Sequence, residues 1–336
     1  MMKFKRLFLL LTFTALMISC KKDENLKSKT TATTKINVNF QEKLPTKKSD
    51  SLTLFTVTLY QRNDLMDAFI SVSDLYTDSL SIPADIIKNQ KKMSFEKLRH
   101  FDLDDNYRKK MLNALQLTEN DSVYIYNYDL NKLTTISINK LKSVAYLTPY
   151  ASEGEDIYEY YYMLGFQLEA QKKWEDIFEK NNHTVASFGR ENPFIENEMV
   201  PIHWKIIKPN DYTNKIFSNS KLIKGNIYEF RNNKLTYYLQ DYKAEEAITR
   251  RQLMVVDHDK NIVFEKTYLN DGEGQEFTAI SGLETEDGFN SQWTGSLFKN
   301  KPPIIFGFTS ESFGCSSVAF MDKTSPEIYI NCDNRH

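Results

Sequence analysis

The sequence predicts an α+β fold dominated by antiparallel β-sheet, arranged as hairpins and a meander, with a few helices mainly in the first half. Composition supports this prediction, because there are 19 tyrosines and 22 phenylalanines but only 11 glycines, and aromatic residues favour strands. Several short segments alternate apolar and polar side chains, as strands with one buried face do. Clusters of Asn, Asp, Ser and Pro separate these segments and indicate turns.

The first predicted elements are a strand, a helix and a hairpin. Residues 51–60 alternate cleanly and are rich in β-branched side chains, so they predict a strand. A helix is expected from Asp104 or Asp105, since either residue can cap it. Residues 121–128 and 133–138 predict the two strands of a hairpin. The predicted helix has an apolar stripe that is typical of a core-facing side, consisting of Tyr107, Met111, Leu112 and Leu115.

A second group of elements is expected before residue 216. Residues 157–168 have an apolar or aromatic side chain at every even position from 158 to 168, which predicts a strand. Residues 183–200 are expected to be irregular, and residues 201–208 to form another strand. Between the strand at 157–168 and the irregular segment at 183–200 we expect a short amphipathic helix, with Trp174, Ile177 and Phe178 on one face.

From about residue 218 the pattern predicts a β-meander. Residues 227–231 and 234–239 flank Asn232-Asn233, a favourable two-residue hairpin turn. Further strands are expected at 253–257, 261–266, 303–309, 316–321 and 327–331.

The N-terminus predicts a secretory signal peptide. Lys3, Lys5 and Arg6 form a positively charged start, and residues 7–18 form an apolar core. This core is too short to span about 30 Å of hydrocarbon as a helix, but it suits a signal peptide. The Ser19-Cys20 pair that follows resembles the lipobox of bacterial lipoproteins. The resemblance implies cleavage before Cys20 and attachment of acyl chains, such as palmitate, to that residue.

Lys22, Asp23 and Glu24 resemble the surface-export signal of Bacteroidetes lipoproteins, which implies a lipid-anchored protein on the outside of the outer membrane. The alternative is a plain charged tether. The following segment is rich in Lys, Thr, Ser and Asn and cannot bury enough apolar surface to offset its ordering entropy. The expected parts are a signal peptide at 1–19, a flexible tether at 20–50, an α+β region at 51–215 and a β-meander region at 216–336. Whether the last two parts are one domain or two stays open.

Charge and motifs exclude several classes of function. Removal of residues 1–19 takes away three positive charges and no acids, so the formal net charge falls from −2 to −5. Without a clustered basic surface, such a chain is a poor nucleic-acid binder. The sequence contains no His-Glu-x-x-His, Cys-x-x-Cys, Gly-x-Ser-x-Gly, phosphate-loop or dinucleotide motif. We therefore expect no cofactor, and we assign no catalytic residue.

Three features of the sequence are weaker candidates for chemistry. His203 is expected to be a solvated histidine on a strand. Residues 257–261 begin like a calcium loop but have Ile262 at the sixth position and Tyr268 at the twelfth, so a hairpin turn is favoured. The acidic, glycine-rich residues 270–276 are a better cation candidate, although such loops are usually solvated turns, and no metal ligand is assigned.

A disulfide between Cys315 and Cys332 is predicted. If Cys20 carries lipid, these are the only remaining thiols, and they would face an oxidising envelope. A turn centred near residues 323–324 would place Phe320 opposite Glu327 and the two cysteines opposite each other.

The sequence does not identify a specific activity. The favoured hypothesis is a non-enzymatic surface lipoprotein whose β-rich body binds a protein or a glycan. The alternative is a hydrolase of cell-surface polymers. In that case paired carboxylates would act as acid and base, and the candidates are Glu153, Glu155, Asp156 and Glu159.

Overall fold

Three larger sheets and a two-stranded ribbon make up most of the regular structure. The computed structural model describes residues 52–62, 65–73, 81–168, 183–218, 221–270, 272, 274–283, 290–312, 314–322 and 324–333. These residues belong to one unit, Asp50–His336. The prediction of a mainly antiparallel β fold is confirmed.

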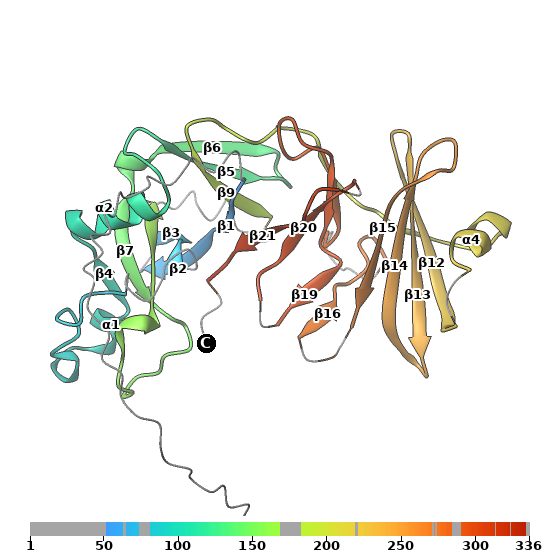
Figure 1. Ribbon diagram of the computed structural model, residues 1–336. Helices are drawn as coiled ribbons and strands as arrows, with labels where there is room; N and C mark the ends of the chain where they lie inside the picture. The colour runs from blue at the N-terminus through green and yellow to red at the C-terminus, as the bar shows by residue number, and fades with distance from the viewer. Residues whose placement is uncertain are drawn as a thin grey trace, which may run out of the picture. The chain divides into compact units, whose positions relative to one another are not determined.

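The largest sheet contains strands from both ends of the described chain (Figure 1). β1 and β21 are parallel neighbours at its centre, with Leu54 opposite Ile330, so strands on both sides of residue 215 share one sheet. In sheet order the nine strands are β10 (Met199–Pro201), β17 (Trp293–Gly295), β18 (Ile304–Phe306), β20 (Ser317–Phe320), β21 (Ile328–Asn331), β1 (Leu54–Thr56), β9 (Thr184–Gly189), β5 (Ser122–Asn127) and β6 (Lys132–Ser137).

Part of this sheet is buried on both faces. In β5, Ile125 belongs to the apolar core shared with the second sheet, whereas its neighbour Tyr126 belongs to a core on the other face. In β20, Val318 and Ala319 also contribute to two different cores. Successive side chains of a strand point to opposite faces, so strands buried on both sides have nearly continuous apolar runs.

The second sheet packs against the first through β3 and β8. All seven residues of β8 are buried. A Cβ at Gly165 would lie 2.1 Å from the carbonyl oxygen of Ile70, so this position requires glycine. In order, the strands are β2 (Thr58–Arg62), β3 (Leu65–Ser71), β8 (Tyr162–Leu168), β7 (Lys142–Leu147) and β4 (His100–Asp102).

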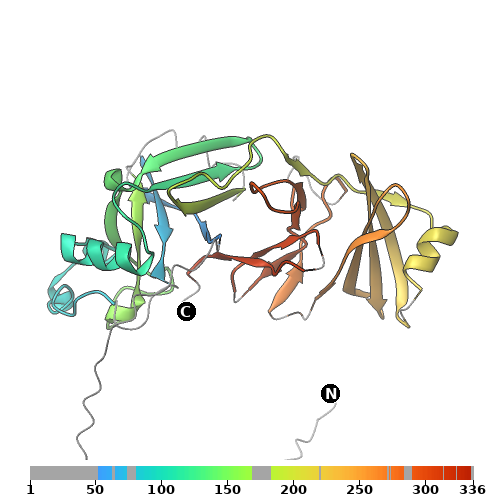
Figure 2. The ribbon, with the colours of Figure 1, turned by 45° about the horizontal axis from the view of Figure 1, so that its top comes forward.

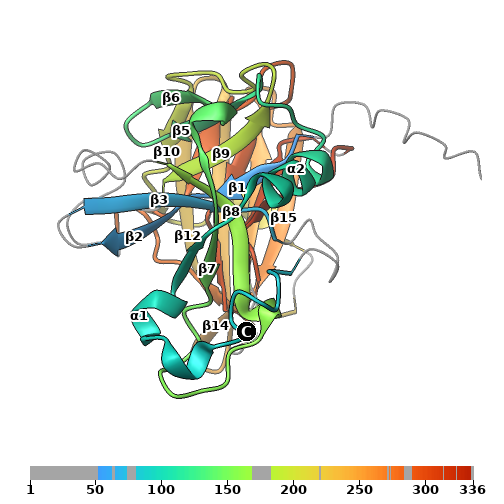
Figure 3. The ribbon, with the colours of Figure 1, turned by 90° about the vertical axis from the view of Figure 1, so that its left-hand side faces the viewer.

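Two helices accompany this sheet. α1 is Phe95–Leu98 and α2 is Asp105–Ala114. Asp104 caps α2, as expected, by accepting hydrogen bonds from the backbone of its first turn. Met111 and Leu112 of the predicted stripe are buried in the core beside β1 and β8, and Figure 3 shows α2 next to these strands.

The third sheet is the meander, and its neighbours follow chain order: β11 (Lys205–Ile207), β12 (Ile223–Asn232), β13 (Leu235–Ala244), β14 (Ala247–Val256) and β15 (Ile262–Leu269). α4 (Asp211–Ile216) lies against one face of it (Figure 2). The other face contacts the first sheet through Ile305 and Ala319. The ribbon pairs β16 (Gln275–Phe277) with β19 (Thr309–Glu311).

Several predicted boundaries were wrong. Residues 183–200 contain β9, which the pattern missed because this strand is buried on both sides and therefore does not alternate. The strand predicted at 157–168 begins only at Tyr162, since the carboxamide of Gln90 binds the backbone of Ile157 and holds it out of the ladder. The strand predicted at 51–60 is divided at Val57 between two sheets.

Two further corrections concern ends of strands. Residues 201–208 form parts of β10 and β11 rather than one strand, because Ile202 and Trp204 donate instead to backbone oxygens of Gln292 and Ser281. The β12–β13 turn lies one residue later than predicted, after Asn232, with Asn233 at φ 52°. The helix predicted around Trp174, Ile177 and Phe178 falls outside the described residues.

Candidate functional site

A cavity of about 980 Å³ lies where the first sheet meets β15 and the β16–β19 ribbon. Residues 56–59, 183–185, 266–268 and 305–311 contribute to its walls, together with residues around the C-terminal cysteines. This volume is near the upper end of the ~300–1,000 Å³ range of small-molecule sites.

The predicted disulfide forms part of the cavity wall. Cys315 and Cys332 are bonded, with their Cα atoms 5.5 Å apart. The predicted strand register was wrong by one residue, because Ser317 lies opposite Tyr329. In the turn between the two strands, the Asp322 carboxylate accepts from the backbone amides of Thr324 and Ser325. The cysteines still meet because both lie beyond the paired residues of the ladder.

Aromatic rings form one part of the lining. Tyr268 stacks on Phe308 with ring centroids 4.7 Å apart, and Tyr128 packs edge-to-face on Phe306 at 5.3 Å. Tyr329 also lines the cavity and is 67% exposed. Burial raises the pKa of Tyr128 and of Tyr268, so both phenols stay neutral.

Neutral polar groups form much of the remaining lining. Two buried hydroxyl oxygens, on Thr184 and Tyr268, have no hydrogen-bond partner among the described residues. An unsatisfied buried hydroxyl costs about 1–3 kcal/mol, which makes such groups informative about function. The hydroxyl-bearing Ser and Thr residues of the wall are Thr56, Thr58, Thr184, Thr267, Thr278, Ser291, Thr309, Ser310, Ser316 and Ser317.

Two carboxylates of the wall are held by polar neighbours. Lys266 Nζ lies 2.6 Å from Glu327 Oε1, and the Ser317 hydroxyl donates to Glu327 Oε2 at 2.8 Å. Glu311 Oε1 accepts from the side-chain amide of Gln275.

His183 is a cavity residue that the sequence analysis missed. It is buried, and its ring lies 5.1 Å from that of Trp293. Burial lowers its pKa and outweighs the opposing charge of Asp129, whose Oδ2 lies 3.6 Å from Nδ1. The imidazole is therefore neutral near pH 7. No sequence motif surrounds it, and only the fold brings it to the cavity.

The predicted site residues lie elsewhere. Glu153, Glu155, Asp156 and Glu159 lie on the connection between β7 and β8 and do not line the cavity. The first three are exposed. His203 is exposed as expected, although it lies between β10 and β11 rather than on a strand.

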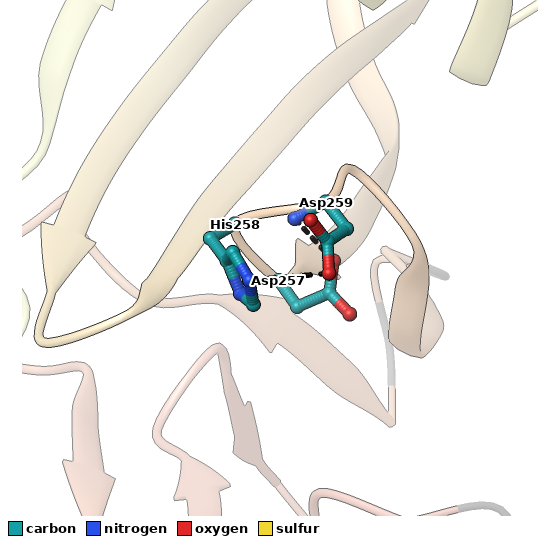
Figure 4. Close-up of side chains that lie close together, drawn as sticks. All are labelled: Asp257, His258 and Asp259. Atoms are coloured by element: carbon teal, nitrogen blue, oxygen red, sulfur yellow. Dashed lines mark hydrogen bonds and ion pairs between the residues drawn. The ribbon is translucent and has the colours of Figure 1, made fainter.

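The turn at Asp257, His258 and Asp259 brings three possible metal ligands within 4.8 Å of one another (Figure 4). Asp257 Oδ1 already accepts from the backbone amides of Asp259 and Asn261. The Asn261 side chain donates to its second oxygen, and these hydrogen bonds lower the Asp257 pKa. The carboxylate thus stabilises the β14–β15 turn, as the hairpin hypothesis predicted.

Other predicted features lie outside the described residues. Asp271 and Glu273 of the candidate cation loop are among them, as are Cys20 and the export motif at Lys22, Asp23 and Glu24. These features stay predictions. Among the described residues, no helix has the length and apolar character needed to cross a membrane.

No family model, curated protein or solved structure matches the chain.

Proposed function

We propose that this protein is a lipid-anchored cell-envelope protein with a non-enzymatic body that binds a glycan in the cavity beside the disulfide. The observation that carries the proposal is the lining of that cavity, in which aromatic rings lie among many hydroxyl groups. Aromatic faces pack on the apolar faces of sugar rings, and neutral hydroxyls exchange hydrogen bonds with sugar hydroxyls.

The charges of the cavity support the same ligand class. Glu327 is paired with Lys266, so this part of the wall is locally neutral. A neutral or weakly charged polyol suits such a wall better than a strongly charged ligand does.

The experiment is a glycan array probed with the full chain, followed by calorimetry with the best fragment. Ser310→Trp should block binding, because Ser310 is an exposed residue of the wall. Tyr329→Ala should weaken binding about tenfold if its ring stacks on the ligand. Tyr150→Ala is the matched control, since Tyr150 is 64% exposed but does not line the cavity. Absence of any glycan ligand, or equal binding by Ser310→Trp, would contradict the proposal.

The hydrolase alternative remains a separate proposal that uses Glu153, Glu155, Asp156 and Glu159. Alanine at Glu155 and Asp156 should then abolish turnover without unfolding the chain, because both side chains are exposed. Unchanged turnover of a substrate found for the wild type would remove this assignment.

Anchoring at the outer membrane rests on the N-terminal motifs. Cys20→Ala should abolish lipid labelling and leave the chain unprocessed or released. Alanine at Lys22, Asp23 and Glu24 should keep the lipid but retain the protein on the inner leaflet. If protease added to intact cells digests that triple variant as fast as the wild type, surface export through this motif is wrong.

A further inference from the structure

A second surface, independent of the cavity, lies on the connection between β7 and β8. We call residues 148–161 the tyrosine loop. Its ends are closed by a hydrogen bond of 2.8 Å from the Thr148 amide to the Tyr161 carbonyl oxygen. Compact surface loops with closed ends are frequently functional.

The backbone of the tyrosine loop is held in place at Ile157. The Gln90 side chain donates to the Ile157 carbonyl at 2.9 Å and accepts from the Ile157 amide at 2.7 Å. Ile157 itself is 2% exposed, in a core with Leu98 and Leu164. The loop therefore presents its outer side chains from a fixed backbone.

The outer side chains include an aromatic cluster. Tyr158 and Tyr160 stack with centroids 5.6 Å apart and an interplanar angle of 9°. Tyr161 meets Tyr160 edge-on at 4.9 Å. Tyr158 is 46% and Tyr160 61% exposed, and Tyr150 on the same loop is 64% exposed. Large exposed aromatic groups of this kind mark interaction surfaces.

The charge of the loop determines what can cover these rings. It contains four acids and no Lys, Arg or His. Elsewhere in the chain tyrosine rings do carry cations, since Lys110 lies 4.7 Å from the Tyr107 ring and Lys260 lies 5.2 Å from the Tyr212 ring. The tyrosine loop offers rings and carboxylates together, and its complement is a cation.

We propose that the tyrosine loop docks a Lys- or Arg-bearing segment of a partner protein. Cationic side chains lie over the rings of Tyr158 and Tyr160, while the carboxylates of Glu153, Glu155 and Asp156 attract and orient the segment. A sugar would stack on the same rings but would gain nothing from four negative charges, so the charge favours the peptide.

The probe is a labelled nonapeptide with three arginines separated by Gly and Ser, titrated against the full chain in detergent. The matched peptide with Glu in place of Arg measures non-specific binding. We expect binding of the basic peptide only, weakening as salt is added. Tyr158→Ala/Tyr160→Ala should lower the affinity about tenfold, whereas Tyr158→Phe/Tyr160→Phe should retain it, because cation–π attraction needs the ring and not the hydroxyl.

Charge variants complete the test. Glu153→Gln/Glu155→Gln should weaken binding, and Glu245→Gln/Glu246→Gln, at an exposed turn with no tyrosine cluster, should not. Coinciding thermal unfolding curves establish that all variants are folded. The proposal fails if the basic peptide does not bind, if the Tyr→Ala pair binds like the wild type, or if the loop binds glycan fragments instead. Ser310→Trp should leave peptide binding unchanged, so this result is separable from the cavity.

Discussion

The meander sheet and the nine-stranded sheet differ in the sequence separation between the strands that pair in them. Every neighbour in the β11–β15 sheet follows in chain order, whereas the centre of the nine-stranded sheet joins β1 to β21. Local hairpins close small loops, while the β1–β21 pair closes nearly the whole described chain, at a greater cost in entropy. We therefore compare the contacts that stabilise each sheet: a buried ion pair in the meander, and a disulfide next to β21 in the nine-stranded sheet.

The meander has a buried ion pair at its centre. Arg251 Nε donates to Asp241 Oδ1 at 3.1 Å, and the two side chains are 4% and 0% exposed. The Tyr228 hydroxyl donates to the second Asp241 oxygen at 2.8 Å, and Arg251 also donates to the Thr278 carbonyl at 2.7 Å. Burial raises the pKa of Tyr228 to about 12, so it remains a donor at ordinary pH.

The largest expected effect on stability comes from removing this ion pair from the meander sheet. Arg251→Ala should lower the free energy of unfolding by about 3–5 kcal/mol, because it leaves the Asp241 charge buried without its partner. Urea unfolding measures the loss. Arg250→Ala, on the opposite face of β14, is the control and should cost less.

A double variant sharpens the same test. Asp241→Leu/Arg251→Met replaces the pair with apolar side chains and should lose less stability than Arg251→Ala alone. Equal losses in the single and double variants would mean that packing, rather than charge, makes this site important.

The second largest effect concerns the nine-stranded sheet, in which β1 pairs with β21. Cys315→Ser/Cys332→Ser should lower the free energy of unfolding by about 3 kcal/mol, since the bond closes a loop of sequence separation 17 next to β21. Reduced wild type should unfold like the double variant. Alkylation of denatured, unreduced protein should find no free thiol at these positions; two free thiols would refute the bridge.

The same contrast explains what the sequence could predict. The β12–β13 and β14–β15 hairpins and the Asp104 cap were found because turn residues and alternation are local properties. β9 was missed because Val185, Ala186 and Ser187 are all buried, so no alternation remains when both faces are covered. The β1–β21 pairing leaves no local pattern at all.

The candidate site was predicted only in part, for the same reason. The cysteines were found because few thiols exist to pair, even though the assumed register was wrong by one residue. The tyrosines and acids of the loop were visible as a cluster in the sequence. His183, Tyr268 and Glu311 reach one cavity from three distant segments, and no spacing rule connects them.

The smallest effect tests one contact between the two sheets, the ion pair between Lys266 of β15 and Glu327 before β21. Partial burial raises the pKa of Glu327, but hydrogen bonds from Lys266 and Ser317 and the Lys266 charge outweigh it, so the pKa is lowered overall from 4.5. A lowered folded-state pKa stabilises the protein above about pH 4.5, and that contribution is lost as the pH falls through the folded-state value.

Glu327→Gln should therefore cost below about 1 kcal/mol at pH 7, because the pair is partly solvated. The difference from wild type should shrink as unfolding is measured at successively lower pH below 4.5. Glu265→Gln, an exposed acid on the same strand as Lys266, should show neither effect. A Glu327→Gln difference that stays constant down to pH 3 would show that the side chain stabilises by shape rather than by charge.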